Sequence, residues 1–457
     1  MQSPIELVDA TERPSLLPKD VRTGAGYPMP EPPVYDEILR CTHCGMCLNQ
    51  CPTYRVLRIE ADSPRGRLYQ MRAVHEGRAE VTVDFAEHMF VCLACRACET
   101  ACPATVRFGS LVEQARAQVE AVNAANRPPW QRALRAAVFQ QLLPYPSRLR
   151  AVAEMSRLYE SSGVRSLVRR AGLLQRLPGG LGEREELMPP LPGQFFTARG
   201  QRYGALGKYR GRVALFNGCI MPLAYGPTQE ATVRVLQRNG LEVVVPDAQI
   251  CCGALAIHAG EREQGKVQAR RNIAAFEALD VDAIIINAAG CGSALKEYGE
   301  LLQHDSEWAE RAHHFSARVK DITEYLSDIG LRPPTGRIAR RVTYQDPCHL
   351  AHGQGVRAQP RELLKAIPGL QLVEMRDADR CCGSAGIYNI TNPDMSQQVL
   401  AEKMVNVKAA RPDIIVTANP GCILQLQAGC RRDGVAAEVM HVIDLLDAAY
   451  RLGDTAS

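Results

Sequence analysis

The sequence is poor in aromatic residues and has almost no charge imbalance. Only 5% of its 457 residues are aromatic, and 54 Lys and Arg face 50 Asp and Glu, a formal net charge of +4. A balance so close to neutral gives no electrostatic basis for binding nucleic acid. No uncharged apolar run approaches the roughly 18 residues that predict a membrane-spanning helix. The first residues, MQSPIE, have neither a basic start nor an apolar run, so we expect no secretory signal peptide.

A nucleotide-binding motif is missing as well. No G-x-G-x-x-G follows a strand-like run, so a flavin or nicotinamide would have to sit on another chain. Gly260 and the pair Gly265-Lys266 have the spacing of a phosphate-binding loop, but Val267 stands where such a loop needs Ser or Thr for Mg²⁺. We therefore expect no nucleotide site at this position.

What the sequence does have is 17 cysteines. The number is odd and no export signal is seen, so a disulfide framework is a poor interpretation, which leaves metal ligation or redox chemistry. Two compact groups lie before residue 103, and the remaining cysteines follow residue 218, with none between. This distribution predicts at least two metal-bearing regions.

Both N-terminal groups read C-x2-C-x2-C-x3-C-P, as CTHCGMCLNQCP and CLACRACETACP. In this pattern three close thiolates bind one iron–sulfur cube, and the fourth Cys, before Pro, binds the other. Zinc is the alternative, but it favours two well-separated C-x2-C pairs. His43, inside the first loop, is expected to be an exposed neighbour. The predicted ligands are Cys41, Cys44, Cys47 and Cys102 for one [4Fe–4S] cluster, and Cys92, Cys95, Cys98 and Cys51 for the second.

The stretch between these two groups predicts a helical insertion. Residues 63–80, SPRGRLYQMRAVHEGRAE, have Ser before Pro and helix-forming residues after it. This arrangement is typical of a helix that starts at the Pro. We therefore expect a helical ferredoxin-type module.

The C-terminal half contains an internal repeat. Cys219, the Cys251-Cys252-Gly253 motif and Cys291 recur at offsets of 129, 130 and 131 residues. The segments around them agree, since ICCGALAIHAG resembles RCCGSAGIYNI and DAIIINAAGCG resembles DIIVTANPGCI. The second set is Cys348, Cys381, Cys382 and Cys422.

Strand-like and helix-like segments alternate in each copy. Residues 212–216, 241–245 and 283–286 are β-rich, and residues 229–238 and 260–279 are helical in pattern. The expected fold class is therefore α/β plus α: a helical N-terminal module followed by two repeated α/β domains with mainly parallel sheets. Each cysteine of the repeat falls just beyond a strand, at the edge where open α/β sheets form sites.

Each copy therefore offers four converging thiolates as candidate metal ligands. The spacing leaves open whether each copy holds a cluster or the two copies share one. The competing interpretation is a set of small buried hydrophobic residues, as free Cys often is. Cys430 has no counterpart in the first copy and is expected to be a core or surface thiol. For His258 and His349, close to thiols, we expect packing rather than ligation.

Three segments without cysteine complete the chain. Residues 131–176 carry nine Arg, no Lys and two acids, so they form either a linker helix or a basic amphipathic surface for an anionic membrane face or a partner subunit. Residues 177–195 are rich in Gly and Pro, and residues 1–33 hold seven Pro and are expected to be extended. The expected domains are an extension at 1–33, the ferredoxin-type module at 34–125, the Arg-rich region and linker at 126–205, and the two repeats at 206–334 and 335–457.

Taken in order, these pieces resemble the iron–sulfur subunit of bacterial glycolate dehydrogenase (glycolate oxidase). The resemblance spans residues 35 to about 450 and rests on CTHCGMCLNQCPTY, SPRGR, CLACRACETACP, CCGALAIH, AAGCG, KEYG, CCGSAGIY and VTANPGC. It implies a cytoplasmic electron-transfer subunit, with no catalytic residue of its own, that works with FAD-binding subunits. Those partners would oxidise glycolate, and clusters on this chain would pass the electrons to an acceptor such as quinone. The resemblance also allows peripheral contact of the chain with the inner face of the plasma membrane. The long Pro-rich N-terminus departs from the family pattern.

Other proteins share the Cys-Cys-Gly domains, so alternatives stay open. The domains also resemble those of anaerobic glycerol-3-phosphate dehydrogenase subunits and of heterodisulfide reductases. In the reductases the motif ends in C-x-x-C, where this chain has Ala294 and Gln425, which argues against a five-thiolate cluster doing disulfide chemistry. The remaining hypotheses are a lactate or glycerol-3-phosphate dehydrogenase subunit, a thiol/disulfide oxidoreductase, and a C-terminal half that is a metal-free scaffold.

Overall fold

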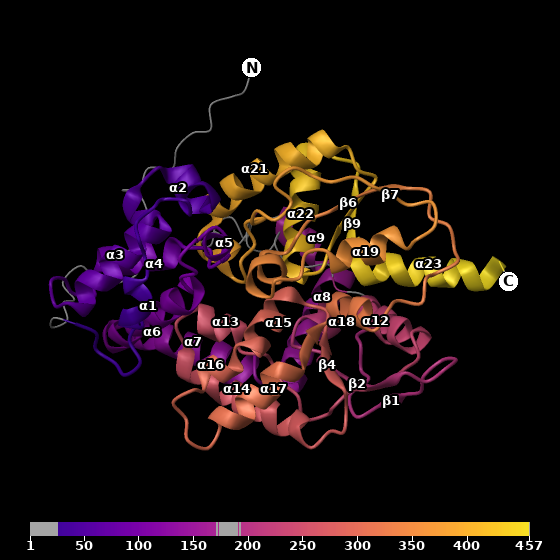
Figure 1. Ribbon diagram of the computed structural model, residues 1–457, viewed down its shortest axis with the longest axis horizontal. Helices are drawn as coiled ribbons and strands as arrows, with labels where there is room; N and C mark the ends of the chain where they lie inside the picture. The colour runs from indigo at the N-terminus through magenta and orange to yellow at the C-terminus, as the bar shows by residue number, and fades with distance from the viewer. Residues whose placement is uncertain (1–25, 171, 173–190, 192, 457) are drawn as a thin grey trace.

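The computed structural model describes residues 26–170, 172, 191 and 193–456. A helical N-terminal region lies beside two α/β domains, and a helical arm connects them (Figure 1). Most of the expected N-terminal extension and of the Gly/Pro-rich linker falls outside the described residues. Residues 26–33 are described and contain no helix or strand; the Met29 N–H donates to Gln118 Oε1 at 2.8 Å.

The N-terminal region is entirely helical. Its third α-helix begins at Pro64 because Ser63 Oγ accepts the Gly66 N–H at 3.0 Å, which caps the first turn. The helix expected over residues 63–80 is therefore present, and it ends at His75. The elements are α1 (Tyr35–Leu39), η2 (Leu48–Gln50), α2 (Pro52–Leu57), η3 (Glu60–Asp62), α3 (Pro64–His75), α4 (Val83–Val91), α5 (Ala97–Thr100) and α6 (Phe108–Asn126).

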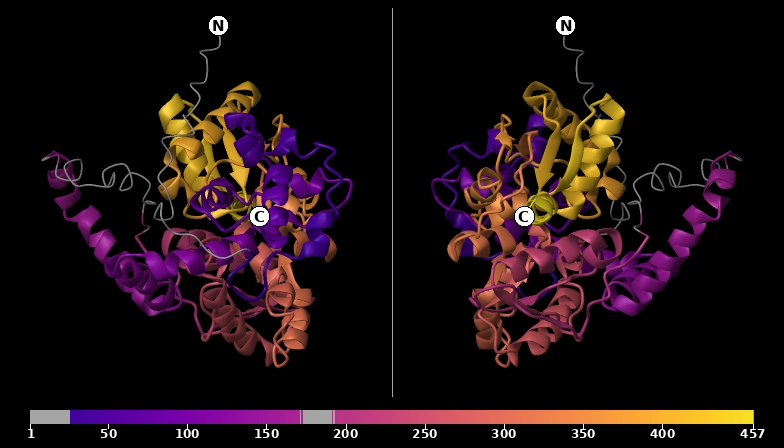
Figure 2. Two further views of the ribbon diagram at one scale, coloured as in Figure 1. Left: turned by 90° about the vertical axis from the view of Figure 1, so that its left-hand side faces the viewer. Right: turned by 90° about the vertical axis from the view of Figure 1, so that its right-hand side faces the viewer.

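A helical arm follows, and Figure 2 shows its purple end extending away from the body. It comprises α7 (Pro129–Ala136), the π-helical turn η4 (Ala137–Leu142), α8 (Pro146–Ser161) and α9 (Val164–Arg170). Met155 and Leu158, one turn apart on α8, are 72% and 67% exposed, and Trp130 on α7 is 66% exposed. The expected Arg-rich helices therefore carry an uncovered apolar face. Both interpretations of this region, linker and docking surface, stay predictions.

The first α/β domain has a five-stranded sheet in the order β1-β3-β2-β4-β5. The strands pair in parallel except β1, which is antiparallel to β3. The three β-rich segments expected from the sequence are β2, β3 and β4, and the two helical segments are α12 and α14. The elements are β1 (Arg202–Tyr203), β2 (Gly211–Leu215), α11 (Met221–Ala224), α12 (Gly226–Arg238), β3 (Leu241–Val244), α13 (Ala254–His258), α14 (Arg262–Glu277), β4 (Ala283–Ile286), α15 (Ala289–Lys296), α16 (Tyr298–Leu301), α17 (Ala309–Arg318), β5 (Val319–Asp321) and α18 (Ile322–Asp328).

The second α/β domain repeats this topology. All strands of its sheet are parallel, in the order β7-β6-β8-β9. This order corresponds, one strand to one strand, to β3-β2-β4-β5 of the first α/β domain. The elements are β6 (Arg341–Tyr344), η5 (His349–Gly353), α19 (Gln359–Lys365), β7 (Gln371–Leu372), α20 (Tyr388–Thr391), α21 (Pro393–Ala410), β8 (Ile414–Thr417), α22 (Pro420–Asp433), β9 (Glu438–His441) and α23 (Val442–Ala456). The expected fold class is confirmed.

The two α/β domains share one apolar core. A single buried cluster contains Val213 and Ile285 from the first sheet and Val342 and Val416 from the second. Polar contacts cross the same boundary, including an ion pair between Arg234 of α12 and Asp447 of α23 at 2.9 Å. Because the domains are packed this tightly, the loops at the carboxyl ends of their strands are held in fixed positions relative to each other.

Candidate metal centres

The first set of four N-terminal cysteines surrounds a small cavity near the surface. The cavity has a volume of about 30 Å³, and Cys41, Cys44, Cys47 and Cys102 line it together with Leu68 and Phe108. The loop wraps around this space because His43 and Gly45 adopt positive φ angles of 56° and 81°. His43 is exposed, as expected, and so is Cys44.

The second set lies deeper. Cys51, Cys92, Cys95 and Cys98 are all buried and line a cavity of about 20 Å³. The structure thus brings Cys51 of the first run to the second run, and Cys102 of the second run to the first. Cys98 and Phe108 line both cavities, so the two sets are direct neighbours.

The four cysteines of each repeat also gather. In the second copy the sulfur atoms of Cys382 and Cys422 are 3.4 Å apart. Each set follows three strands of its sheet, as expected for the carboxyl edge of a parallel sheet. Three of its cysteines lie between a strand and the helix that follows it, and the last, Cys291 or Cys422, lies in the first turn of α15 or α22. The first set is Cys219, Cys251, Cys252 and Cys291, and the second is Cys348, Cys381, Cys382 and Cys422.

Both repeat sets face one large cavity. Its volume is about 500 Å³, and all eight repeat cysteines and Cys92 line it. Cys348 and Cys381 also belong to one apolar cluster with Cys95, and the Tyr388 hydroxyl, from the second α/β domain, donates to the Val91 carbonyl at 2.7 Å. The three groups of candidate ligands therefore form a continuous series: the repeat cavity, the buried N-terminal set, and the N-terminal set at the surface.

Burial makes two thiols of the second N-terminal set poor anions without a metal. It raises the pKa of Cys95 and of Cys98 well above the usual value of 9. A bound metal reverses this preference, because coordination removes the thiol proton. Four thiols arranged around a cavity are the donor set of an iron–sulfur cube, so the residues fit such a group. Within the described residues, no three His, Cys, Asp or Glu side chains have the arrangement of a single-ion site.

The two histidines near the repeat cavity pack against each other. The rings of His258 and His349 are 5.5 Å apart, and His258 Nδ1 lies 3.1 Å from Glu113 Oε1. Burial lowers the pKa of His349 to about 3, so its ring is neutral at physiological pH. Cys430, without a counterpart in the first copy, is a buried core residue of the second α/β domain.

The phosphate-loop spacing does not form a phosphate site. Lys266 lies on α14, is 7% exposed, and binds carboxylates of Glu31 at 2.7 Å and Glu263 at 2.9 Å. Its charge is thus already compensated.

Sequence reasoning missed a buried arginine beside the second cysteine set. Arg67, in the SPRGR motif, has no exposed surface and lies near Cys51 and Cys92. The sequence offered two signals: an Arg within the helix expected over residues 63–80, and Thr53 two residues after Cys51. Neither signal predicts that Arg67 is buried, because the residues that cover its side chain come from α4 and the η3 turn.

Family models match the three regions of the chain that the cysteines and arginines defined. A "4Fe-4S dicluster domain" matches residues 37–106, and a "Cysteine-rich domain" matches residues 213–296 and 342–427. The model "Glycolate oxidase iron-sulfur subunit, linker region" matches residues 130–188, which include the arm.

Curated relatives extend this similarity over most of the chain. A "Probable glycolate oxidase iron-sulfur subunit" of Bacillus subtilis is 43% identical over 90% of this chain and 93% of its own length. The chain belongs to the glycolate oxidase iron–sulfur subunit family. The Escherichia coli glycolate oxidase iron–sulfur subunit is 35% identical over 91% of this chain and 95% of its own length. "Lactate utilization protein A" of a Geobacillus strain is 31% identical, over 52% of this chain and 99% of its own length.

Membership of the glycolate oxidase iron–sulfur subunit family confirms the resemblance read from the motifs. It makes the chain an iron–sulfur oxidoreductase subunit, and so a component of a complex with other subunits. Among the described residues, no helix is long and apolar enough to cross a membrane.

Proposed function

We propose that this chain is the electron-transfer subunit of a complex that oxidises glycolate to glyoxylate. FAD-binding partner subunits would take two electrons from the 2-hydroxy acid, and this chain would relay them to an acceptor, for which we propose quinone. The observation that carries the proposal is the continuous series of cysteine sets from the large cavity to the surface. Relatives named as glycolate oxidase subunits support glycolate as the substrate.

Two N-terminal cysteine sets would hold one [4Fe–4S] cluster each. Such clusters supply one-electron transfer, at potentials set by charge, hydrogen bonds and solvent exposure. The chain's own part is to hold the sites adjacent, to exclude water from the inner one, and to leave the outer one accessible at Cys44. The proposed ligands are Cys41, Cys44, Cys47 and Cys102 for the outer site, and Cys51, Cys92, Cys95 and Cys98 for the inner site.

The repeat cysteines would hold one or two further clusters. Two sets of four thiols line one cavity large enough for more than a single small group, which supports this assignment. Thiol/disulfide chemistry is disfavoured, because Ala294 and Gln425 stand where the disulfide-reducing proteins with similar domains have the last Cys of a C-x-x-C motif.

Activity of the co-expressed complex tests this function. With all subunits present, glycolate should reduce a dye, while the isolated chain should show no turnover. Cys95→Ser should abolish that activity, because it removes a proposed ligand of the inner site. The matched control is Cys430→Ser, a buried cysteine outside every set, which should keep the activity. Turnover of lactate but not glycolate would favour the lactate alternative, and disulfide reduction by the isolated chain would contradict the relay.

A further inference from the structure

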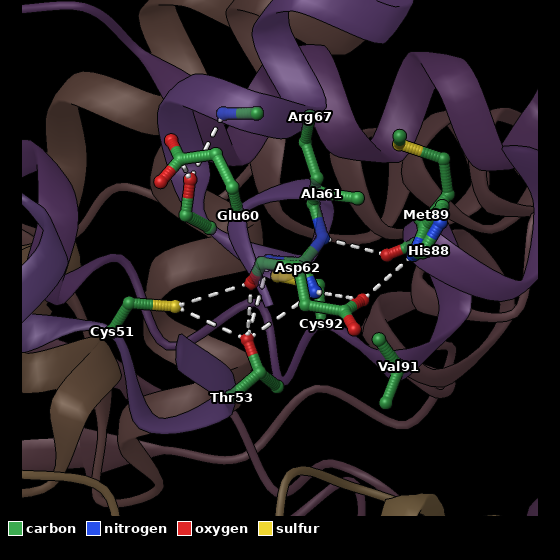
Figure 3. Close-up of polar contacts among 12 residues, drawn as sticks. Cys51, Thr53, Glu60, Ala61, Asp62, Arg67, His88, Met89, Val91 and Cys92 are labelled. Carbon is green, nitrogen blue, oxygen red and sulfur yellow. Dashed lines mark hydrogen bonds and ion pairs between the residues drawn. The ribbon is translucent and has the colours of Figure 1, made fainter. Parts of the chain in front are cut away.

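Arg67 places a positive charge beside the inner cysteine set. Its side chain is completely buried, and Figure 3 shows its head group among Thr53, Asp62 and Cys92, with Cys51 on the far side of Thr53. A guanidinium keeps its proton in proteins, even where it is buried. The guanidinium therefore stays charged in a place from which water is excluded.

Most hydrogen bonds of Arg67 go to neutral oxygen atoms, and one buried carboxylate, that of Asp62, opposes its charge. Its Nε–H donates to the His88 carbonyl at 2.6 Å, and Nη1 donates to the Asp62 carbonyl at 2.6 Å. Both Nη groups donate to Thr53 Oγ1, at 3.3 and 3.2 Å. The carboxylate of Asp62 is farther away, at 3.4 Å, and is shared with His88 Nδ1 at 2.9 Å. The Asp62 carboxylate offsets part of the charge, and the rest of the field of the cation acts on the neighbouring sulfur atoms.

Thr53 connects the cation to a proposed ligand. Its oxygen accepts from Arg67 and lies 3.1 Å from Cys51 Sγ, and its hydroxyl donates to the Asp62 carbonyl at 2.7 Å. A thiolate at Cys51 can only accept a hydrogen bond, so the single Thr53 hydroxyl hydrogen would move from the Asp62 carbonyl to that sulfur, and the carbonyl would keep Arg67 Nη1 as its donor. The polarised hydroxyl would then stabilise added negative charge on Cys51.

Among the residues that the structure describes, the outer set has no comparable cation beside it. Arg65 is the neighbouring charge there, but its side chain is 30% exposed and lies 2.6 Å from Glu60 Oε1. Water, salt and the carboxylate screen it. Arg116, a second buried arginine near the inner set, donates to the backbone carbonyls of Met89 and Cys92 rather than to a hydroxyl beside a sulfur atom.

We propose that Arg67 sets the reduction potential of the inner site, through its buried charge and through Thr53. Reduction adds one negative charge there and neither forms nor breaks a bond. Burial opposes that added charge, and Arg67 offsets the opposition, so the inner site holds the electron more tightly than its burial alone would allow. The proposal rests on the proposed function, which places a cluster on Cys51, Cys92, Cys95 and Cys98.

An EPR-monitored redox titration of the anaerobically purified full chain tests this role, with dithionite as the electron donor. The signal lost in Cys95→Ser identifies the inner site. In Arg67→Gln the midpoint potential of that site should become more negative, whereas Arg67→Lys, which keeps the charge, should shift it less. Thr53→Val should shift it in the same direction by a smaller amount. Asp62→Asn, which removes the opposing carboxylate, should make it more positive.

The opposite signs separate charge from structural damage, because loosened packing would not raise the potential in one variant and lower it in another. Arg72→Gln is the matched control on the same helix: the Arg72 side chain is 42% exposed and pairs with Glu76, so the potential of the inner site should not move. An Arg67→Gln chain with full iron and an unchanged potential would overturn the proposal. If the Arg67→Gln chain loses iron, the potentials of Asp62→Asn and Thr53→Val test the proposal instead. Shifts of the same sign in both variants, or no shift in either, would overturn the proposal. A wild-type chain that gives fewer than two EPR signals would instead refute the proposed function.

Discussion

A single buried ring shows how one residue can couple the two α/β domains to pH. His441, at the end of β9, donates from Nε2 to the carbonyl of Asn287 at 2.8 Å, in the other domain. Its Nδ1 accepts the Ile443 N–H at 3.1 Å. Both nitrogens are therefore used by the neutral ring, and burial lowers the pKa of His441 to about 4, although the Asn287 carbonyl opposes this.

The stability contributed by the neutral His441 ring should disappear on acidification. In the unfolded chain the ring titrates near 6.5, so it is protonated there while the folded ring is still neutral. This contribution is complete above pH 6.5 and falls as the pH drops toward 4, by about 3 kcal/mol in total. In His441→Gln the melting temperature should fall less between pH 7 and pH 5 than in the wild type. The exposed His304→Gln is the control, and an equally steep fall in His441→Gln would contradict this account.

At the residue scale, the sequence predicted which cysteines are candidate metal ligands, but not which charged residues lie beside them. The cysteines could be assigned to sets because metal chemistry restricts their spacing. Arg67 could not be assigned, because its burial depends on η3 and α4, which it meets only in the folded chain. The same is true of the bond between His441 and Asn287, which joins residues 154 positions apart.

At the scale of elements, α3 depends on a glycine for its close approach to η3. A Cβ on Gly66 would lie 1.9 Å from the backbone oxygen of Glu60. Backbone cannot move aside as a flexible side chain does, so the helix needs Gly at this position. Because Arg67 is the next residue, this contact also fixes where its guanidinium lies.

Gly66→Ala should therefore destabilise the N-terminal region, by about 1–3 kcal/mol, the usual cost of overpacking. Thermal unfolding followed by circular dichroism would measure this, together with iron content. Gly204→Ala is the matched control, because nothing lies within 4 Å of a Cβ there. Equal melting temperatures for the two variants would show that α3 can shift without cost.

Elements were largely predictable where the pattern was strong. The strand expected over residues 283–286 matches β4, because four buried apolar residues in a row are typical of a central parallel strand. Helix limits were less accurate: the helix expected from residue 229 begins at Gly226, where Pro227 starts the first turn. The expected helix over 63–80 ends five residues early, at His75.

At the scale of the whole molecule, the repeat predicted two similar domains but not their convergence on one cavity. Convergence depends on how α12 packs on α23 and how the Tyr388 segment meets the end of α4. No spacing in the sequence encodes such contacts between domains. They are what place both repeat sets beside the inner N-terminal set, and so what makes a continuous relay physically reasonable.

Iron and acid-labile sulfide per chain, measured after anaerobic purification, test the central claim most directly. The account predicts more than about eight irons, because two cubes hold about eight and the repeat cysteines add to them. Cys252→Ser with Cys382→Ser should return the value to about eight. A value that stays near eight with or without those changes would leave the C-terminal half as a scaffold. Stoichiometric zinc with almost no iron would contradict the electron relay itself.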